Sequence, residues 1–552
     1  MKHGFRIISC ILLLCILLSS MTSCLTYVRI MDMAYDGTLD GGSEQDVPSL
    51  DYPHLEYTLT DDDEAAFLSV LADCEAISLS GGDPETIDEA WDMVYDQYYH
   101  ISTQAQIAYI LYCCDLTDET LSGNYLYASE MQANVYDAYI VVCQKLDQSD
   151  SSYREHFFSD WTEAELKEMR LYSDRVTELH RKNDQILVDY RDLDVTEEGE
   201  KVSDLYADLV ANNNEIAKKL GYKNYYDYAS ELIYMRDYGK DERALLRTYV
   251  KEYLVPLCAA VWDQFDAAMN ELSAKDYNFV IDFMDEDYDE LSGDYLQSYL
   301  NSFEGSSKAA MEGMLEEGNS IFTDSSNALE GAFTATLSEY EKPVCYFGPS
   351  YQDILTVVHE MGHYYGAQYT EDEDLVMDLA EVQSQGNEWL LLTFLQEELD
   401  EDVYEAVVSY QLYMMLTTIV VSTVVDEFEE YIYTVSARNP LTVIDYDRAM
   451  DSICASYGGT EFFEEYITDM QMYWKYVVIE SPVYYISYAV SGVAALALYE
   501  EATYDYARAQ QTYRKLLENV NPEKEFLGNL VDAGLRTPFD ERLYRDIQRL
   551  AS

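Results

Sequence analysis

Basic residues are scarce in this chain of 552 residues, where 34 Lys and Arg stand against 105 Asp and Glu for a formal net charge of −71. This excess of acid repels phosphate backbones and argues strongly against a nucleic-acid partner. It also argues against binding to an anionic membrane through a basic surface. Because 48% of the residues are hydrophobic and 14% are aromatic, the chain still has enough apolar surface for a large packed core.

Proline and glycine are also few, with 10 and 24 residues, which favours long helices joined by short connections. Thr162 and Glu165 form a capping box, and apolar residues recur behind it at three- and four-residue steps as far as Tyr190. This pattern predicts one long amphipathic helix. A local exception runs from Ala332 to Tyr346, where two apolar stretches bracket a polar turn and predict a small β-hairpin. The sequence therefore predicts an all-α fold with one hairpin.

Seven cysteines follow Cys24, an odd number at irregular spacing and without a C-x-x-C pair. Such a set is not a disulfide framework or a cysteine-based zinc site. We expect these side chains to be small buried apolar groups.

The N-terminus has the pattern of a bacterial lipoprotein signal peptide over residues 1–23. Lys2 and Arg6 precede the apolar run from Ile7 to Leu18, which is of signal-peptide length. Met21-Thr22-Ser23-Cys24 follows, where small residues before a cysteine predict that Cys24 carries the lipid. We expect export to the outer face of the bacterial cytoplasmic membrane, with residues 24–55 as a flexible acidic tether. The alternative is a plain cleaved signal and a secreted protein.

A second apolar stretch, Ala406 to Val425, contains no charged residue. Glu405 and Asp426 flank it, several hydroxyl side chains interrupt it, and no basic residue lies nearby to orient a membrane span. We interpret it as a buried helix, so that the N-terminal lipid is the only expected membrane attachment.

The chemistry of the chain is concentrated in His359-Glu360-Met361-Gly362-His363. Only 7 histidines occur in the whole sequence, and two of them stand here four residues apart. On a helix these imidazoles share one face and can bind one Zn²⁺, while Glu360 can take a proton from water at the metal. The apolar residues that precede the motif support a helix.

A catalytic zinc site needs a third protein ligand and an open position. On the next predicted helix, Asp378, Glu381 and Glu388 share one face. If the two helices pack antiparallel, Glu381 lies against His359 and His363 as the third ligand. Asp378 and Glu388 are then candidates to orient the imidazole N–H groups, although solvated acids are the other reading of both.

These motifs together resemble the thimet oligopeptidase and oligoendopeptidase F family of zinc metallopeptidases. The similarity extends over roughly residues 205–545 and rests on the zinc motif with its lead-in and on these further segments: Gly331-Ala332-Phe333-Thr334, Leu379-Ala380-Glu381-Val382 with Ser384 and Glu388, Leu220 to Tyr228 with Arg236-Asp237, Tyr485 to Gly492, and Phe526-Leu527 to Gly534-Leu535.

The resemblance implies His359, His363 and Glu381 as zinc ligands, Glu360 as general base, and Tyr485 or Tyr488 as donor to the oxyanion. It also implies a large two-lobed helical fold around a deep central channel. Two features depart from the family. No His follows His363, so Tyr476, Ser481 or Tyr484 is the candidate for a substrate contact that family members make with a histidine. The interval from His363 to Glu381 is also a few residues short.

We therefore expect an N-terminal helical lobe over residues 56–204 and a catalytic domain over 205–552. The expected function is a zinc-dependent endopeptidase, with one Zn²⁺ per chain and short oligopeptides as substrates. One alternative is a peptide-binding surface lipoprotein with weakened catalysis, motivated by the missing histidine. Another is a related zinc carboxypeptidase or dipeptidase. The sequence does not indicate an oligomeric state or a residue preference.

Overall fold

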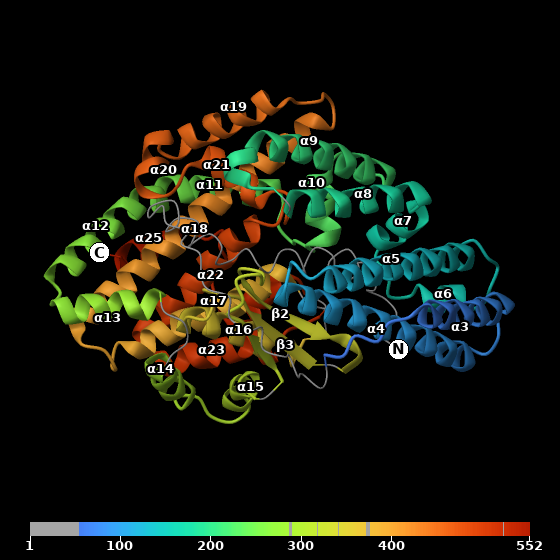
Figure 1. Ribbon diagram of the computed structural model, residues 1–552, viewed down its shortest axis with the longest axis horizontal. Helices are drawn as coiled ribbons and strands as arrows, with labels where there is room; N and C mark the ends of the chain where they lie inside the picture. The colour runs from blue at the N-terminus through green and yellow to red at the C-terminus, as the bar shows by residue number, and fades with distance from the viewer. Residues whose placement is uncertain are drawn as a thin grey trace.

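The computed structural model describes residues 55–551 except 192, 286–289, 317, 341, 371–375 and 523. The predicted signal peptide, the lipid-attachment residue Cys24 and all of the tether except its last residue lie outside this part of the chain. Within it the fold is helical, as predicted: 74% of the described residues are helical, and they include one small sheet (Figure 1).

The N-terminal helices build a core of their own. They are α3 (Asp61–Ser80), α4 (Pro84–Cys114), α5 (Glu119–Asp147), α6 (Arg154–Phe157) and α7 (Glu163–Leu171). Trp91 is buried at the centre of this core, where its ring lies 4.6 Å from that of Phe157. The apolar side chains of this cluster run from Leu59 to Met169, and a larger cluster begins at Val176. The boundary between the two hydrophobic cores thus lies near residue 172. The predicted boundary between an N-terminal lobe and a catalytic domain, at 204/205, stays a prediction.

The predicted capping box is present, but the long helix behind it is not. The side chain of Thr162 accepts from the backbone N–H of Glu165 at 3.2 Å. Tyr172 then leaves the helix with an extended backbone, and α8 (Asp174–Arg191) begins a new one. The side chain of Gln144 on α5 donates to the carbonyls of Met169 and Tyr172. A contact from another helix therefore satisfies the end of α7, which the periodicity of the segment itself does not reveal.

The larger core begins with helices that cover its outside. They are α8, α9 (Val195–Lys219), α10 (Tyr225–Tyr228), α11 (Lys240–Tyr249), α12 (Val255–Glu271), α13 (Ala274–Asp285), α14 (Glu290–Leu300) and α15 (Ser306–Met314), with π-helical turns at Ala229–Ile233 and Val250–Leu254. The segment around Leu220–Tyr228 is expected to resemble a helix–turn–helix of the family. In the structure it contains the turn between α9 and α10 and α10 itself.

The remaining helices include the most deeply buried ones. They are α16 (Ile354–Ala367), α17 (Met377–Leu395), α18 (Glu401–Ser436), α19 (Val443–Cys454), α20 (Thr460–Tyr466), α21 (Met470–Val477), α22 (Ile486–Tyr504), α23 (Tyr506–Glu518), α24 (Phe526–Ala533) and α25 (Glu541–Leu550). Nearly all residues of α16, α17 and α22 are buried, and Figure 1 shows these three helices near the middle of the molecule.

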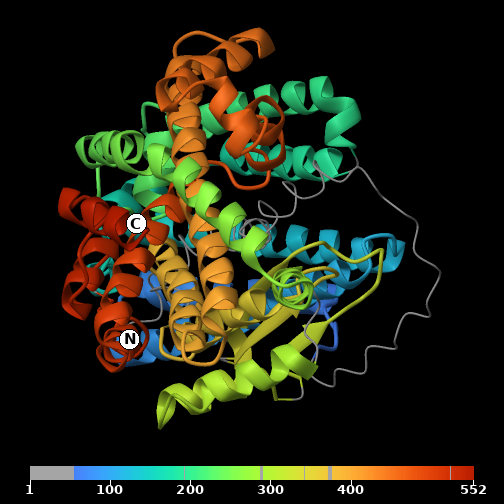
Figure 2. The same ribbon diagram turned by 90° about the vertical axis from the view of Figure 1, so that its left-hand side faces the viewer.

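Helix α18 contains the uncharged stretch from Ala406 to Val425. Among the described residues it is the one helix long and apolar enough to cross a membrane, and 78% of its most apolar window is buried within the protein. The prediction of a buried core helix is therefore confirmed. Figure 2 shows α18, in orange, running through the body of the molecule.

The predicted hairpin is also confirmed. Strands β2 (Ala332–Leu337) and β3 (Lys342–Phe347) pair antiparallel, with Thr334 opposite Cys345. The sequence did not reveal β1 (Ser320–Phe322), which pairs parallel with β3 and completes a sheet of order β1-β3-β2. A strand of three residues is too short to show a period. Side chains of α4, including Ile107 and Ile110, pack against the sheet and join it to the N-terminal core.

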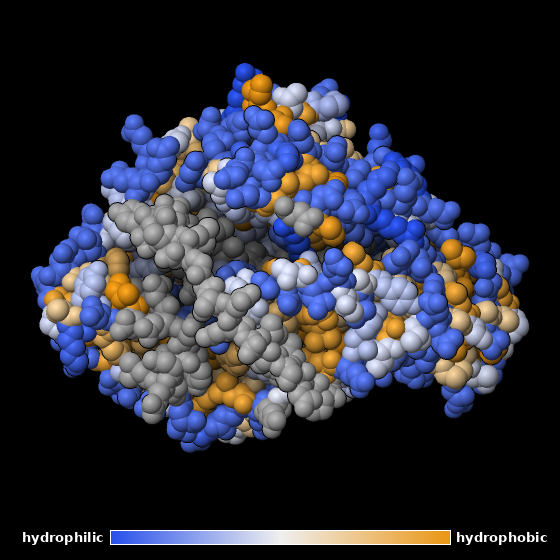
Figure 3. Space-filling model, viewed as in Figure 1, coloured by the Kyte–Doolittle hydropathy of each residue, from blue (hydrophilic) through white to orange (hydrophobic). Residues whose placement is uncertain are grey.

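The surface and the cysteines agree with the composition. The coloured part of the face in Figure 3 is mostly hydrophilic, in agreement with the charge of −71. All seven cysteines from Cys74 to Cys454 are free and buried, as predicted.

Glu168 allows a test of the packing between the two cores. This carboxyl of α7 is 2% exposed and accepts a hydrogen bond from Tyr228 of α10 at 2.6 Å. Burial raises its pKa from 4.5 to about 7, so the native fold favours the protonated form. The stabilisation from this group is present below its ordinary pKa and is lost as the pH rises through 7.

We expect Glu168→Gln to remove this pH dependence. Relative to the wild type, the free energy of unfolding of the variant should rise by up to about 3 kcal/mol between pH 4.5 and pH 8, because Gln carries no charge to bury. Urea unfolding of both proteins across this range measures the difference. A difference that stays constant with pH would show that Glu168 is ionised in the native protein.

Candidate metal centre

Helix α16 brings the two histidines of the motif together. Asp353 caps it, accepting from the backbone N–H groups of Leu355 and Thr356 at 3.0 Å each. His359 and His363 follow one turn apart on the same face, with ring centroids separated by 5.0 Å. Both side chains are buried.

Helix α17 packs antiparallel to α16 at very short range. Asn387 donates to the carbonyl of Val358 at 2.7 Å, at one end of the contact. Towards the other end, a Cβ on Gly362 would lie 2.6 Å from the carbonyl oxygen of Gln383 and 2.7 Å from the Cα of Ser384. Only glycine permits this approach of the two backbones. The expected antiparallel pairing is therefore present.

This packing brings the third predicted ligand to the histidines. Glu381 Oε2 lies 3.8 Å from His359 Nε2 and 4.0 Å from His363 Nε2. Donor atoms of these three residues all lie within 4.8 Å of one another. Zinc binds nitrogen and oxygen donors at about 2.0–2.2 Å, so separations near 4 Å leave room for one ion between them. Burial lowers the pKa of His363 well below its ordinary value and keeps its ring neutral, as a metal ligand must be. The three residues fit a zinc ion.

Glu388 lies where the sequence places it, behind the first histidine. Its Oε1 is 2.7 Å from His359 Nδ1, and its Oε2 accepts from Gln411 of α18 at 2.8 Å. With the proton on Nδ1, the lone pair of His359 Nε2 faces Glu381. Glu388 can therefore fix both the tautomer and the orientation of this imidazole.

Asp378 does not contact an imidazole, in contrast to the prediction. Its side chain is fully buried, accepts a hydrogen bond from Tyr238 at 2.7 Å, and lies 3.8 Å from the Nε of Arg236. It stands one helical turn before Glu381 and faces the segment after α10 rather than α16.

Glu360 is held beside the histidines by the sheet. Thr334 of β2 donates to Glu360 Oε2 at 2.8 Å. The carboxyl is 2% exposed, and burial raises its pKa from 4.5 to about 7. A carboxyl with such a pKa can accept and release a proton near neutral pH.

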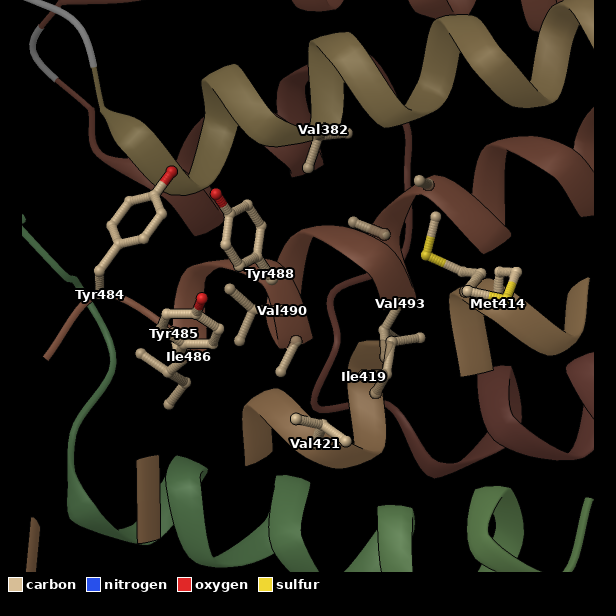
Figure 4. Close-up of a cluster of buried hydrophobic side chains, with 14 of the residues drawn as sticks. Val382, Met414, Ile419, Val421, Tyr484, Tyr485, Ile486, Tyr488, Val490 and Val493 are labelled. Atoms are coloured by element: carbon tan, nitrogen blue, oxygen red, sulfur yellow. The ribbon is translucent and has the colours of Figure 1, made fainter. Parts of the chain in front are cut away.

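Tyr484, next to the predicted pair, contacts the ligand set. Its hydroxyl donates to Glu381 Oε1 at 2.5 Å. Figure 4 shows the hydroxyls of Tyr484 and Tyr488 directed towards the start of α17, and their rings lie 5.0 Å apart. Tyr485 packs against Tyr488 and Tyr473, with ring centroids at 5.6 and 6.5 Å.

The sequence analysis named Tyr484 only as a candidate substitute for a histidine and missed this contact with Glu381. The chain has 53 tyrosines, so the spacing of tyrosines in the sequence does not show that Tyr484 rather than Tyr485 contacts a ligand.

Comparison with known proteins gives matches among solved structures alone, since no family model and no curated protein sequence matches the chain. PZ peptidase A with an inhibitor is similar at a TM-score of 0.70 and 17% identity, over 92% of this chain and 99% of that one. A Bacillus anthracis protein described as an oligoendopeptidase F matches at 0.70 and 18%, over 92% and 98%. Oligoendopeptidase F from Enterococcus faecium matches at 0.59 and 15%, over 89% and 96%. The chain thus has the fold of these peptidases, as the resemblance predicted.

The contact at Gly362 predicts a specific sensitivity. We expect Gly362→Ala to lower the free energy of unfolding by about 1–3 kcal/mol or more, because the new methyl group meets backbone atoms that cannot rotate away. Zinc affinity should fall as well, since Glu381 moves with α17. Gly123→Ala is the control: it lies inside α5 with nothing within 4 Å of the added Cβ. That variant should gain roughly 0.5–1 kcal/mol. Equal effects in urea unfolding would contradict the close contact.

Glu388 gives a second prediction. We expect Glu388→Gln to weaken zinc binding by about 10–100-fold, because the imidazole of His359 loses its charged partner. Competition with a chromogenic chelator measures the dissociation constant. Glu397→Gln, an exposed change just beyond the end of α17, is the control and should leave it unchanged. If both variants bind zinc as the wild type does, Glu388 does not orient a ligand.

Proposed function

We propose that this chain is a zinc-dependent endopeptidase that hydrolyses short oligopeptides. The convergence of His359, His363 and Glu381, with Glu360 on the same helix as the histidines, is the observation that carries the proposal. Two imidazoles and one carboxylate are a ligand set of catalytic zinc sites that retain an open position. When bound, zinc supplies a Lewis acid for the peptide carbonyl and lowers the pKa of a water molecule.

In this proposal Glu360 carries the proton. It takes one from the attacking water and passes it to the leaving amine of the cleaved peptide bond. Burial of Glu360 disfavours its charged form, which makes this carboxyl a better base than an ordinary glutamate. The hydrogen bond from Thr334 holds the carboxyl in one orientation.

Tyrosine hydroxyls stabilise the negative charge that develops on the carbonyl oxygen. Of the predicted pair, Tyr488 is the better placed, because it lies beside Tyr484 with its hydroxyl towards α17 (Figure 4). Removing such a donor typically costs on the order of 10²–10³ in rate. Tyr484 has a different role, since its hydroxyl is engaged by Glu381.

The substrate class is inferred from the fold. The similar structures are PZ peptidase and oligoendopeptidase F proteins, which supports oligopeptides as substrates. A deep channel between two lobes, as the resemblance implies, admits extended peptides and excludes folded proteins by size. From the sequence of residues 1–24 we further propose export and lipid attachment at Cys24, so that the substrates are extracellular peptides.

The test is digestion of a mixed peptide library, read by mass spectrometry with and without a chelator. We expect internal cleavage that the chelator abolishes and zinc restores. Glu360→Gln should lose about 10²–10⁴ in rate while keeping fold and zinc. Glu168→Gln is the matched control, because it makes the same change in a buried carboxyl whose pKa is also about 7, away from the site.

Other results identify the alternatives. Loss of terminal residues only would indicate a carboxypeptidase or dipeptidase. An intact library with a zinc-bound protein would indicate a peptide-binding lipoprotein. Full activity in Glu360→Gln would contradict the assignment of the base.

A further inference from the structure

The segment Pro482–Tyr485, called here the tyrosine loop, has a strained backbone. Val483 has a φ of +65°, which is unfavourable for a β-branched residue and persists only where surrounding contacts enforce it. Glu429 of α18 accepts from the N–H of Val483 with both carboxyl oxygens at 3.0 Å. Tyr234 donates to the carbonyl of Pro482 at 2.9 Å. These hydrogen bonds thus fix the residue that immediately precedes Tyr484, in spite of its strain.

Arg236 holds the other side of the tyrosine loop. Its Nη2 donates to the carbonyl of Tyr484 at 3.3 Å and to Ser487 Oγ, in the first turn of α22, at 3.0 Å. Its Nε lies 3.8 Å from Asp378 Oδ1, and both side chains of this ion pair are 0% exposed. One guanidinium therefore links the tyrosine loop to the first turn of α17.

The contacts close a ring around the predicted ligand Glu381. Asp378 and Glu381 stand one turn apart on α17. Arg236 therefore ties the backbone of Tyr484 to the turn of α17 that carries Glu381, which is the residue that the Tyr484 hydroxyl contacts. Tyr484 donates to Glu381 Oε1, while Oε2 faces His359 and His363. A shift of Tyr484 along the helix would break the short hydrogen bond and free the carboxylate to rotate.

We propose that Arg236 is a positioning residue that holds the Tyr484 hydroxyl on Glu381 and so orients this carboxylate towards the imidazole pair. The inference rests on the proposed function as far as it takes the three residues to be metal ligands. The described polar contacts of Arg236 are with Tyr484, Ser487 and Asp378 and not with a predicted ligand, so it acts through Tyr484.

Stability alone does not account for a buried arginine here. Desolvating both charges of a buried pair often costs as much as the pair returns, and apolar residues of similar volume can be as stable. The planar guanidinium supplies a fixed geometry that joins one acceptor of the tyrosine loop, one acceptor in the first turn of α22 and one carboxylate. A lysine ammonium on a flexible chain does not reproduce this.

A double-mutant cycle tests the proposal, with zinc affinity and kcat as readouts. We expect Arg236→Gln and Tyr484→Phe each to weaken zinc binding by about 10–100-fold. The double variant should be no weaker than the more affected single variant, because both changes break the same contact. Arg236→Lys should not rescue either readout.

Arg243→Gln is the matched control. Arg243 is 6% exposed, lies over the ring of Tyr226, and pairs with Glu430 at 3.6 Å, so it is a buried arginine with no bond to the tyrosine loop. We expect Arg243→Gln to lower stability while leaving zinc affinity near that of the wild type. In the double variant with Tyr484→Phe, the fold-changes of the two single variants in zinc affinity should multiply.

Effects of Arg236→Gln and Tyr484→Phe that multiply in full would overturn the proposal. If Arg236→Gln fails to fold, Ser487→Ala removes one acceptor of the guanidinium and enters the same cycle with the same two outcomes. A wild-type protein that binds zinc but cleaves no peptide contradicts the proposed function, while the cycle in zinc affinity still decides the role of Arg236.

Discussion

The contact between the backbones of α16 and α17 at Gly362 is the constraint on which the candidate site depends. Each helix alone carries only part of a ligand set, and a side chain of any size at this position would separate them. With the backbones in contact, Glu381 reaches both histidines and Glu388 reaches the far nitrogen of His359. The sheet then approaches from another side, where Thr334 fixes Glu360. The ligand set therefore depends on the short distance between the backbones of α16 and α17 at Gly362.

Local patterns in the sequence predicted the parts of the site that depend on one element. The spacing of His359 and His363, the hairpin and the cap at Thr162 all follow from the period of a helix or a strand. Periodicity also placed Asp378 and Glu388 on one face of α17, yet only Glu388 contacts an imidazole. The helical period of a sequence shows which residues share a face, but not which segment packs against that face. Asp378 packs against the segment that contains Arg236 and Tyr238.

The features that escaped prediction depend on contacts between distant segments. The break between α7 and α8 is stabilised by Gln144, about thirty residues earlier on α5. Tyr484 contacts Glu381 from a loop in which Val483 has a positive φ and donates its N–H to Glu429. Neither β-branched Val483 nor the adjacent tyrosines indicate such a turn in the sequence. The π-helical turn Ala229–Ile233, which leads towards Arg236, likewise has no local signature.

Burial of the seven thiols lowers their reactivity. Burial raises the pKa of Cys74, Cys114, Cys258 and Cys454 to about 12, so these sulfurs carry almost no thiolate at neutral pH. They therefore neither compete with the imidazoles for a soft metal nor react readily with peroxide or with other thiols. None of the seven is cross-linked, so packing rather than a disulfide among them holds the described helices together.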